Sequence, residues 1–93
     1  EDAGDVDMAA QAYRYGVELG RASESGAGWE ASAKAAFGLG LILSRTVDLD
    51  EAAQAYRTSM ELARLSNTAE GLEAGQKAAY NLKLLPTGEI RDE

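Results

Sequence analysis

The chain repeats itself after 43 residues. The stretch "DVDMAAQAYR" (Asp5–Arg14) returns as "DLDEAAQAYR" (Asp48–Arg57), and "GWEASAKAAFGLGL" (Gly28–Leu41) returns as "GLEAGQKAAYNLKL" (Gly71–Leu84). Residues 5–43 align with the later copy without a gap, and about half of the aligned positions are identical. Duplication at such a period is typical of proteins built by stacking one supersecondary unit. This feature constrains the fold more than any single motif in the chain.

Each copy has the pattern of two helices. In residues 49–65, apolar and small residues recur at steps of three and four, which places them on one face of a helix. No run of β-branched residues and no hairpin turn signal is present, so we expect no strands. The sequence therefore predicts an all-α single domain over residues 1–93. Its expected helices cover residues 5–23, 27–45, 48–66 and 69–85, and an acidic tail covers residues 87–93.

Helix boundaries are marked by capping residues. Asp48 followed by Glu51 predicts the start of the third helix as a capping box, and Asn67 followed by Glu70 predicts the start of the fourth. Pro86 predicts the end of the fourth helix, because proline cannot continue the backbone hydrogen bonding of a helix.

Glycine occurs inside the expected helices, where each residue costs about 1 kcal/mol relative to alanine. We expect close helix packing to compensate this cost at Gly16 and Gly40. The sequence offers no specific reason for Gly20 and Gly38.

The spacing of the large and small residues across the second and third helices resembles the tetratricopeptide repeat. The first helix of the pattern has a Leu-Gly pair and a large residue three positions later. The next helix opens with a large residue, which is followed by a small residue, an aromatic residue and another small residue. It is carried by Leu39, Gly40, Leu43, Leu49, Ala52, Tyr56 and Ser59, and in the earlier copy by Val6, Ala9, Tyr13 and Gly16. The usual period of that family is 34 residues. This chain resembles the longer-helix variety found in kinesin light chains and in repeat arrays of bacterial regulators.

The resemblance implies an α-solenoid fragment of antiparallel helix-turn-helix repeats. If the two helices of a repeat are called A and B, the order along this chain is B-A-B-A. In the last helix, Lys83 stands where Gly40 stands in the earlier copy, and Pro86 replaces Leu43. Both changes suit a solvated last helix that caps an array.

Composition argues against several classes of function. The chain has no cysteine and no histidine, which removes thiolate metal sites, the commonest general base and the commonest metal ligand, and a nucleophile would have to be Ser, Thr, Tyr or Lys. The net charge of −7 lies mostly at the two ends, and no basic stripe suited to nucleic acid is present. No apolar run approaches the roughly 18 residues that span a membrane. We expect no enzyme activity, cofactor, metal, nucleic acid or membrane partner.

Paired carboxylates occur at Asp5 and Asp7 and again at Asp48 and Asp50. As metal ligands they would need further converging oxygens. Helix capping and favourable interaction with the helix dipole explain them more simply.

The candidate partner-binding residues lie on one stripe of each A helix. Helices A line the concave groove that holds peptides in tetratricopeptide arrays, so the resemblance assigns binding to this face. The stripe comprises Lys34, Phe37, Leu41, Arg45, Lys77, Tyr80, Asn81 and Leu84. Apolar contacts would hold an extended or helical peptide while Lys34 and Lys77 meet its acidic groups. The alternative is that this stripe packs against a neighbouring helix or a second subunit.

These observations predict a non-catalytic interaction scaffold that binds a peptide or a partner helix. The first helix has no A helix before it, and its stripe of Val6, Ala9, Ala10, Tyr13 and Val17 is expected to be partly uncovered. The alternative function is therefore self-association as a homodimer through this helix. A third possibility, by family analogy alone, is an effector-sensing piece of a bacterial regulator. The sequence does not fix the location of the protein, and we favour the cytoplasm.

Overall fold

The computed structural model describes residues 3–45 and 49–85, and this part of the chain is all helical. Its helices are α1 (Ala3–Ser23), α2 (Gly26–Ser44), α3 (Leu49–Ser66) and α4 (Ala69–Leu84). The predicted fold class and order of helices are confirmed. The boundaries agree within two residues, with α1 beginning at Ala3 rather than at Asp5. The predicted cap at Asp48, the stop at Pro86 and the tail over 87–93 lie outside the described residues.

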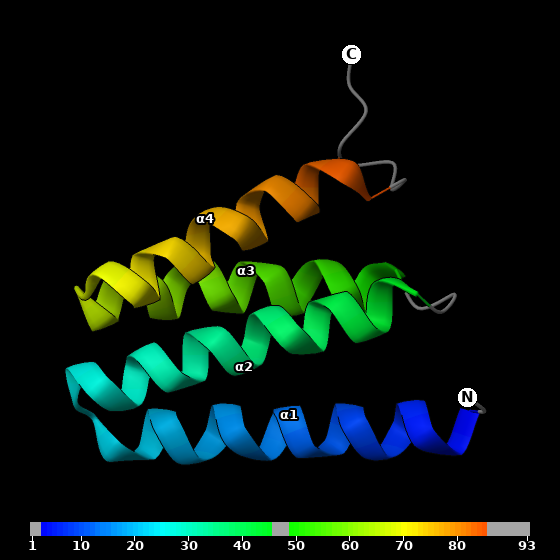
Figure 1. Ribbon diagram of the computed structural model, residues 1–93, viewed down its shortest axis with the longest axis horizontal. Coiled ribbons are helices and arrows are strands. Elements are labelled where there is room, and N and C mark those ends of the chain that lie inside the picture. Colours follow the sequence, from blue (N-terminus) through cyan, green and yellow to red (C-terminus); the bar gives the residue numbers. More distant parts are fainter. Residues whose placement is uncertain (1–2, 46–48, 86–93) are drawn as a thin grey trace.

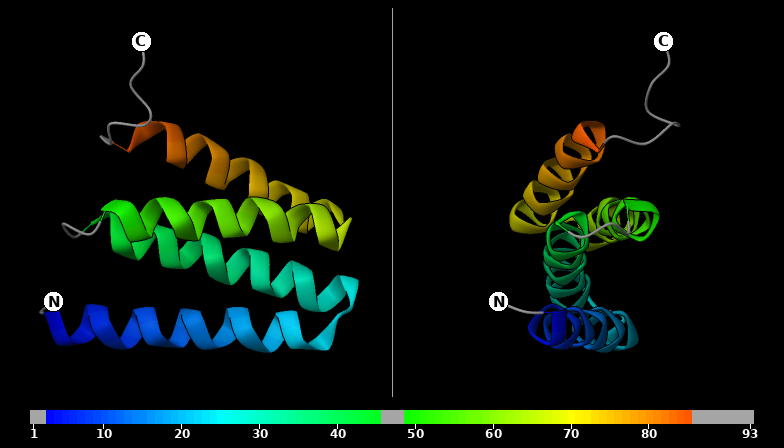
Figure 2. Two further views of the ribbon diagram at one scale, coloured as in Figure 1. Left: turned by 180° about the vertical axis from the view of Figure 1, so that it is seen from behind. Right: turned by 90° about the vertical axis from the view of Figure 1, so that its right-hand side faces the viewer.

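The helices form a slab with principal-axis extents of 36 × 33 × 16 Å. Consecutive helices run antiparallel, so that α1 and α3 run in one direction and α2 and α4 in the other (Figure 1). Viewed from the side, α3 lies on one side of α2 and α4 (Figure 2). Helix α2 is central, because it contacts α1, α3 and also α4, which is not its neighbour in sequence.

The turns before α2 and α4 have the same geometry in both copies. Glu24 and Asn67 occupy equivalent places and adopt positive φ angles of 51° and 53°. The following residue then caps the next helix: Ser25 Oγ accepts from the Gly28 backbone N–H, and Thr68 Oγ1 accepts from the Gly71 backbone N–H, both at 3.0 Å. The duplicated sequence thus encodes a duplicated turn.

The fourth helix begins where Asn67 and Glu70 predict it, at Ala69, but Asn67 is not its N-cap. Thr68 is the N-cap of α4, and Asn67 is the left-handed residue that ends α3. Asparagine tolerates that conformation better than most residues with a side chain, which suits it to the end of a helix as well as to its start. Glu70 does not cap the helix but pairs with a lysine of α2.

The core is made largely of alanine, with one large aromatic residue at its centre. Tyr56 is 1% exposed and lies among alanines of α3 and leucines of α2. Burial raises the pKa of its phenol, and a hydrogen bond with Ser44 partly offsets that rise. Two fully buried serines join neighbouring helices: Ser32 Oγ donates to the Val17 carbonyl at 2.6 Å, and Ser59 Oγ donates to the Ala33 carbonyl at 2.8 Å.

Glycines let the tyrosine rings lie directly on the backbone of α2. A methyl group at Gly40 would lie 2.5 Å from the Tyr56 ring, and one at Gly38 would lie 2.5 Å from the Tyr13 ring. Close packing at Gly40 is therefore confirmed, and Gly38 has the same explanation. At Gly16 the expectation of close packing is wrong, because an added methyl group would only touch Ala35 at 3.4 Å.

A glycine also lies at the crossing of the two helices in each copy, but it belongs to the first helix of the pair in one copy and to the second helix in the other. At the α1–α2 crossing, the glycine is Gly20 on α1, and a methyl group there would collide with the Ser32 hydroxyl and the Gly28 carbonyl. At the α3–α4 crossing, the equivalent of Gly20 is Ala63, and the glycine is instead Gly75, where an added methyl group would lie 2.5 Å from the Ala63 methyl group. At each crossing, therefore, one of the two facing residues is a glycine: Gly20 faces Ser32, and Gly75 faces Ala63.

The apolar stripe expected to be uncovered on α1 packs instead against α2. Ala10 and Val17 are 4% and 7% exposed, while Ala9 and Tyr13 are half-buried. The Val6 side chain lies outside the described side chains. Helix α1 has small or apolar residues on two opposite faces, and the packing selects this one because Gly38 and Gly20 allow α2 to approach it.

Candidate functional site

A hollow lies where α2 and α4 face one another. It has a volume of about 310 Å³ and is lined by Lys34, Phe37, Glu70, Glu73, Ala74 and Lys77. We call this hollow the α2–α4 groove. Three of the eight residues predicted to bind a partner line it, namely Lys34, Phe37 and Lys77.

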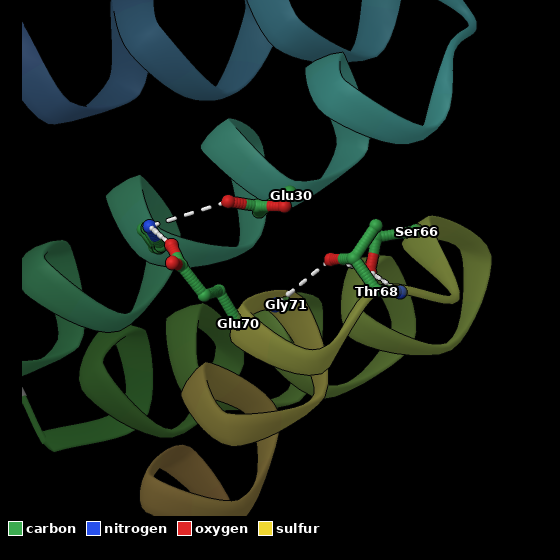
Figure 3. A network of polar contacts seen from close by, with 6 residues as sticks. Glu30, Ser66, Thr68, Glu70 and Gly71 are labelled. Atoms are coloured by element: carbon green, nitrogen blue, oxygen red, sulfur yellow. Dashed lines mark hydrogen bonds and ion pairs between the residues drawn. The ribbon is translucent and has the colours of Figure 1, made fainter.

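Charged groups of the α2–α4 groove pair with one another. Lys34 Nζ lies 3.3 Å from Glu30 Oε2 on its own helix and 2.5 Å from Glu70 Oε1 across the groove. Figure 3 shows the Glu30 side chain of α2 and the Glu70 side chain of α4 each pointing toward the same nitrogen atom, which is Lys34 Nζ. On α4, Lys77 Nζ lies 3.7 Å from Glu73 Oε2. The lysines of the groove are thus already in contact with carboxylates of the chain.

The pairing shifts two ionisation equilibria. The hydrogen bond that Lys34 donates to Glu70, followed by the one it donates to Glu30, raises the pKa of Lys34 above its ordinary 10.5. The hydrogen bond from Lys34 lowers the pKa of Glu70 below its ordinary 4.5. Both side chains are solvent-exposed, so the pair fastens α2 to α4 only modestly and is weakened by salt.

The apolar members of the predicted stripe differ between the two helices. Phe37 and Leu41 are half-buried and pack on the core, with the Phe37 ring centroid 6.1 Å from that of Tyr56. Their counterparts in the second copy, Tyr80 and Leu84, are 64% and 61% exposed. The second copy therefore presents the apolar surface that the first copy uses partly for packing.

The two remaining predicted residues face other surroundings. Asn81 is half-buried, and its Nδ2 donates to the Lys77 carbonyl one turn earlier at 2.8 Å. Arg45 is the C-cap of α2, where its backbone N–H donates to the Ile42 carbonyl at 3.2 Å and its side chain is exposed. Neither side chain lines the α2–α4 groove.

Sequence reasoning missed the carboxylates of this site, Glu30, Glu70 and Glu73. Two of them had a signal in the sequence, because Glu30 precedes Lys34 by four residues and Glu73 precedes Lys77 by four, the same pair in both copies. The contact between Lys34 and Glu70 had no signal in the sequence, because the two residues are 36 positions apart.

A second hollow lies on α2 between α1 and α3. It has a volume of about 210 Å³, and residues of all three helices line it. Arg14 crosses this gap and pairs with Glu51 at 2.9 Å. Helices α1 and α3 are thus joined by an exposed charged contact beside this hollow.

Comparison of the chain with protein-family models, with curated proteins and with solved structures found no match. Within residues 3–45 and 49–85, no helix is long and apolar enough to cross a membrane. The same residues contain no group of three acidic side chains arranged to hold a metal ion. Of the paired carboxylates, Asp7 and Asp50 are exposed, while the Asp5 side chain and Asp48 lie outside the described part.

Stability should depend on pH through the pair of Glu70 and Lys34. Because the folded-state pKa of Glu70 is lowered, its contribution is fully present above pH 4.5 and is lost as the pH falls through the lowered value. Because the pKa of Lys34 is raised, its contribution is present below pH 10.5 and is lost as the pH rises through the raised value. Urea denaturation at a series of pH values between about 2.5 and about 7, which brackets the ordinary pKa of a glutamate, measures the loss of stability in acid.

We expect Glu70→Gln to flatten this acid limb of the stability curve. The matched control is Glu73→Gln, which removes an equal charge from the same helix and leaves the contact between Lys34 and Glu70 intact. Equal flattening by both variants would show that general charge, and not this pair, produces the pH dependence.

Proposed function

We propose that the chain is a non-catalytic interaction module that binds a peptide or a helix of a partner protein along the α2–α4 groove. The observation that carries this proposal is the hollow between α2 and α4 together with the exposed apolar side chains of Tyr80 and Leu84. These two residues follow Lys77 by three and seven positions and so lie on the same side of α4.

Exposure of these two side chains favours contact with another molecule. A large aromatic ring and a leucine side by side on one helix are costly to solvate, and such surfaces are common at protein interfaces. Lys83 and Gln76 show that α4 carries polar residues at other exposed positions. Tyr80 and Leu84 are nevertheless the most exposed large apolar residues of α4, since Leu72 is 41% exposed.

The charges of the groove indicate the chemistry of the ligand. Three carboxylates, of Glu30, Glu70 and Glu73, stand against the two ammonium groups of Lys34 and Lys77, so the groove is slightly acidic. An acidic ligand would have to displace Glu70 from Lys34. We therefore favour a peptide with apolar residues for Phe37 and Tyr80 and with at least one lysine or arginine, rather than the acidic peptide expected from the sequence.

The internal duplication supports a tetratricopeptide-like arrangement. The order B-A-B-A, the repeated turn before each A helix, and contact between the two A helices α2 and α4 agree with that resemblance. In such an arrangement the A helices provide the binding surface, which is the surface proposed here.

A peptide selection tests the proposal. A peptide library displayed on phage would be selected on the immobilised chain, and the best peptide titrated into labelled protein while amide chemical shifts are recorded. We expect shifts at Phe37, Lys77 and Tyr80. Truncation of Tyr80 or Leu84 to alanine should weaken binding by about fivefold or more, because anchors of this kind contribute about 1 kcal/mol or more.

The control variant is Leu65→Ala, which removes an exposed leucine of α3 away from the groove. It should leave the affinity unchanged. Selected peptides whose shifts fall on α3, or whose affinity responds to Leu65 and not to Tyr80, would refute binding in the α2–α4 groove.

A further inference from the structure

The hollow between α1 and α3 combines an apolar lining with charged side chains along one wall. We call it the α1–α3 hollow. The charged residues follow one another at steps of four and three, so they lie on one side of α1; they are Arg14, Glu18 and Arg21. The apolar lining comes from all three helices and consists of Val17, Ala36, Leu39 and Ala55.

Two of these charged groups have no ion-pair partner within residues 3–45 and 49–85. Arg14 could pair with Glu18 one turn later, but its guanidinium instead reaches Glu51 of α3 at 2.9 Å. Glu18 and Arg21 are both exposed and are in no ion pair with another side chain of these residues. Beside an apolar surface, the α1–α3 hollow thus offers one unpaired carboxylate and one unpaired guanidinium.

The α2–α4 groove shows the contrasting arrangement. All four of its charged side chains are in ion pairs, Lys34 with Glu70 and Lys77 with Glu73. A ligand of the groove has to displace such a contact before it reaches a charge. A ligand of the α1–α3 hollow meets Glu18 and Arg21 without displacing any contact between described side chains.

The closeness of the two opposite charges selects the kind of ligand. Side chains three residues apart on a helix have Cβ atoms about 5–6 Å apart. A simple anion on Arg21 would be repelled by Glu18, and a simple cation on Glu18 would be repelled by Arg21. An α-amino acid carries its ammonium and carboxylate groups on one carbon atom, so it can meet both charges at once. Guanidinium also binds a carboxylate through two parallel hydrogen bonds.

The size and the lining of the hollow restrict the side chain of such a ligand. Its volume of about 210 Å³ is below the roughly 300–1,000 Å³ of sites for drug-sized molecules. The small side chains of Ala36 and Ala55 leave space between the helices, and that space is lined mainly by carbon. An aliphatic side chain of the size of leucine, isoleucine or valine suits it, because its burial removes apolar area from water.

We propose that the α1–α3 hollow binds a free aliphatic amino acid. The ligand's carboxylate lies on Arg21, its ammonium group lies on Glu18, and its side chain covers the apolar lining. No residue lines both this hollow and the α2–α4 groove. The amino-acid site and the proposed peptide site are therefore tested independently.

The test is a titration of leucine into the isotopically labelled chain, followed by amide chemical shifts. We expect shifts at Val17, Leu39 and Ala55 and a dissociation constant of about 1 mM, a modest value because the hollow is open to solvent. N-acetyl-leucine lacks the ammonium group and leucinamide lacks the carboxylate. Each should bind about fivefold more weakly, because an exposed charged contact contributes up to about 1 kcal/mol. Glycine retains both charges without the side chain and should bind about tenfold more weakly or worse.

Two variants assign the charges to residues. Arg21→Gln should abolish the difference in affinity between leucine and leucinamide, and Glu18→Gln should abolish that between leucine and N-acetyl-leucine. The duplication supplies matched controls, because Glu61→Gln and Arg64→Gln make the same changes at the equivalent positions of α3, which do not line this hollow. Both differences should persist in the controls. Circular dichroism confirms that each variant is folded.

Three results would overturn the proposal. The first is the absence of shifts around the hollow at millimolar leucine. The second is equal affinity for leucine, leucinamide and N-acetyl-leucine, which would mean that the charges of α1 do not recognise the ligand. The third is equal affinity for glycine and leucine, which would mean that the apolar lining takes no part in binding.

Discussion

Replacing Tyr56 with alanine should lower the free energy of unfolding by about 3–5 kcal/mol, the range measured for loss of a large buried aromatic side chain. Tyr56 is 1% exposed, its ring lies on the backbone at Gly40, and it is the largest fully buried side chain among the described residues. Its removal leaves a cavity at the contact of α2 and α3. For a domain of this size that loss is a large fraction of the total stability.

The matched control is Tyr13→Ala, which removes the same side chain from the equivalent position of the first copy. Tyr13 is half-buried, whereas Tyr56 is 1% exposed. We expect a loss of about 1–2 kcal/mol, in proportion to the smaller area removed from water. Urea denaturation monitored by circular dichroism measures both values. Equal losses would mean that α1 and α3 are equally buried in solution, contrary to the exposures described above.

Duplication is the reason that the order of helices was predictable from the sequence. Two copies of one pattern double the evidence for each helix, and the turn residues of one copy confirm those of the other. The start of α4 was predicted at Asn67 to Glu70, but the residue type alone does not identify the cap, because asparagine suits both the last residue of one helix and the cap of the next. The φ angle of 53° that decides between them is a property of the backbone and not of the residue type.

Contacts between separate helices were less accessible to sequence reasoning. The roles of Gly20 and Gly38 depend on which residues of another helix lie opposite, and helical periodicity does not contain that information. The same limit applies to the site, where Lys34 was predicted but its partner Glu70 was not. On α1, residues at both faces have helical spacing, and only the packing shows that Val17 is buried while Tyr15 is exposed.

Replacing Gly20 with alanine should lower the free energy of unfolding by about 1–2 kcal/mol, the overpacking cost less the gain in helix propensity. Alanine is the better helix former by about 1 kcal/mol, yet its methyl group would collide with the Ser32 hydroxyl and with the Gly28 carbonyl. Overpacking of this kind costs about 1–3 kcal/mol or more when backbone must move. Gly16→Ala, four residues earlier on α1, should instead stabilise by up to about 1 kcal/mol, because its methyl group meets Ala35 at an ordinary 3.4 Å.

The α3–α4 crossing predicts which second substitution should restore part of the stability that Gly20→Ala removes. There Ala63 lies opposite Gly75, so Gly20→Ala combined with Ser32→Gly reproduces in the first copy the residue pair of the second. The double variant loses the hydrogen bond from Ser32 to the Val17 carbonyl, and its new methyl group at position 20 still collides with the Gly28 carbonyl. It should therefore not regain full stability. A double-mutant cycle should nevertheless give a favourable coupling of at least about 1 kcal/mol. Strictly additive losses would mean that the Gly28 carbonyl alone, and not the serine side chain, sets the distance between α1 and α2.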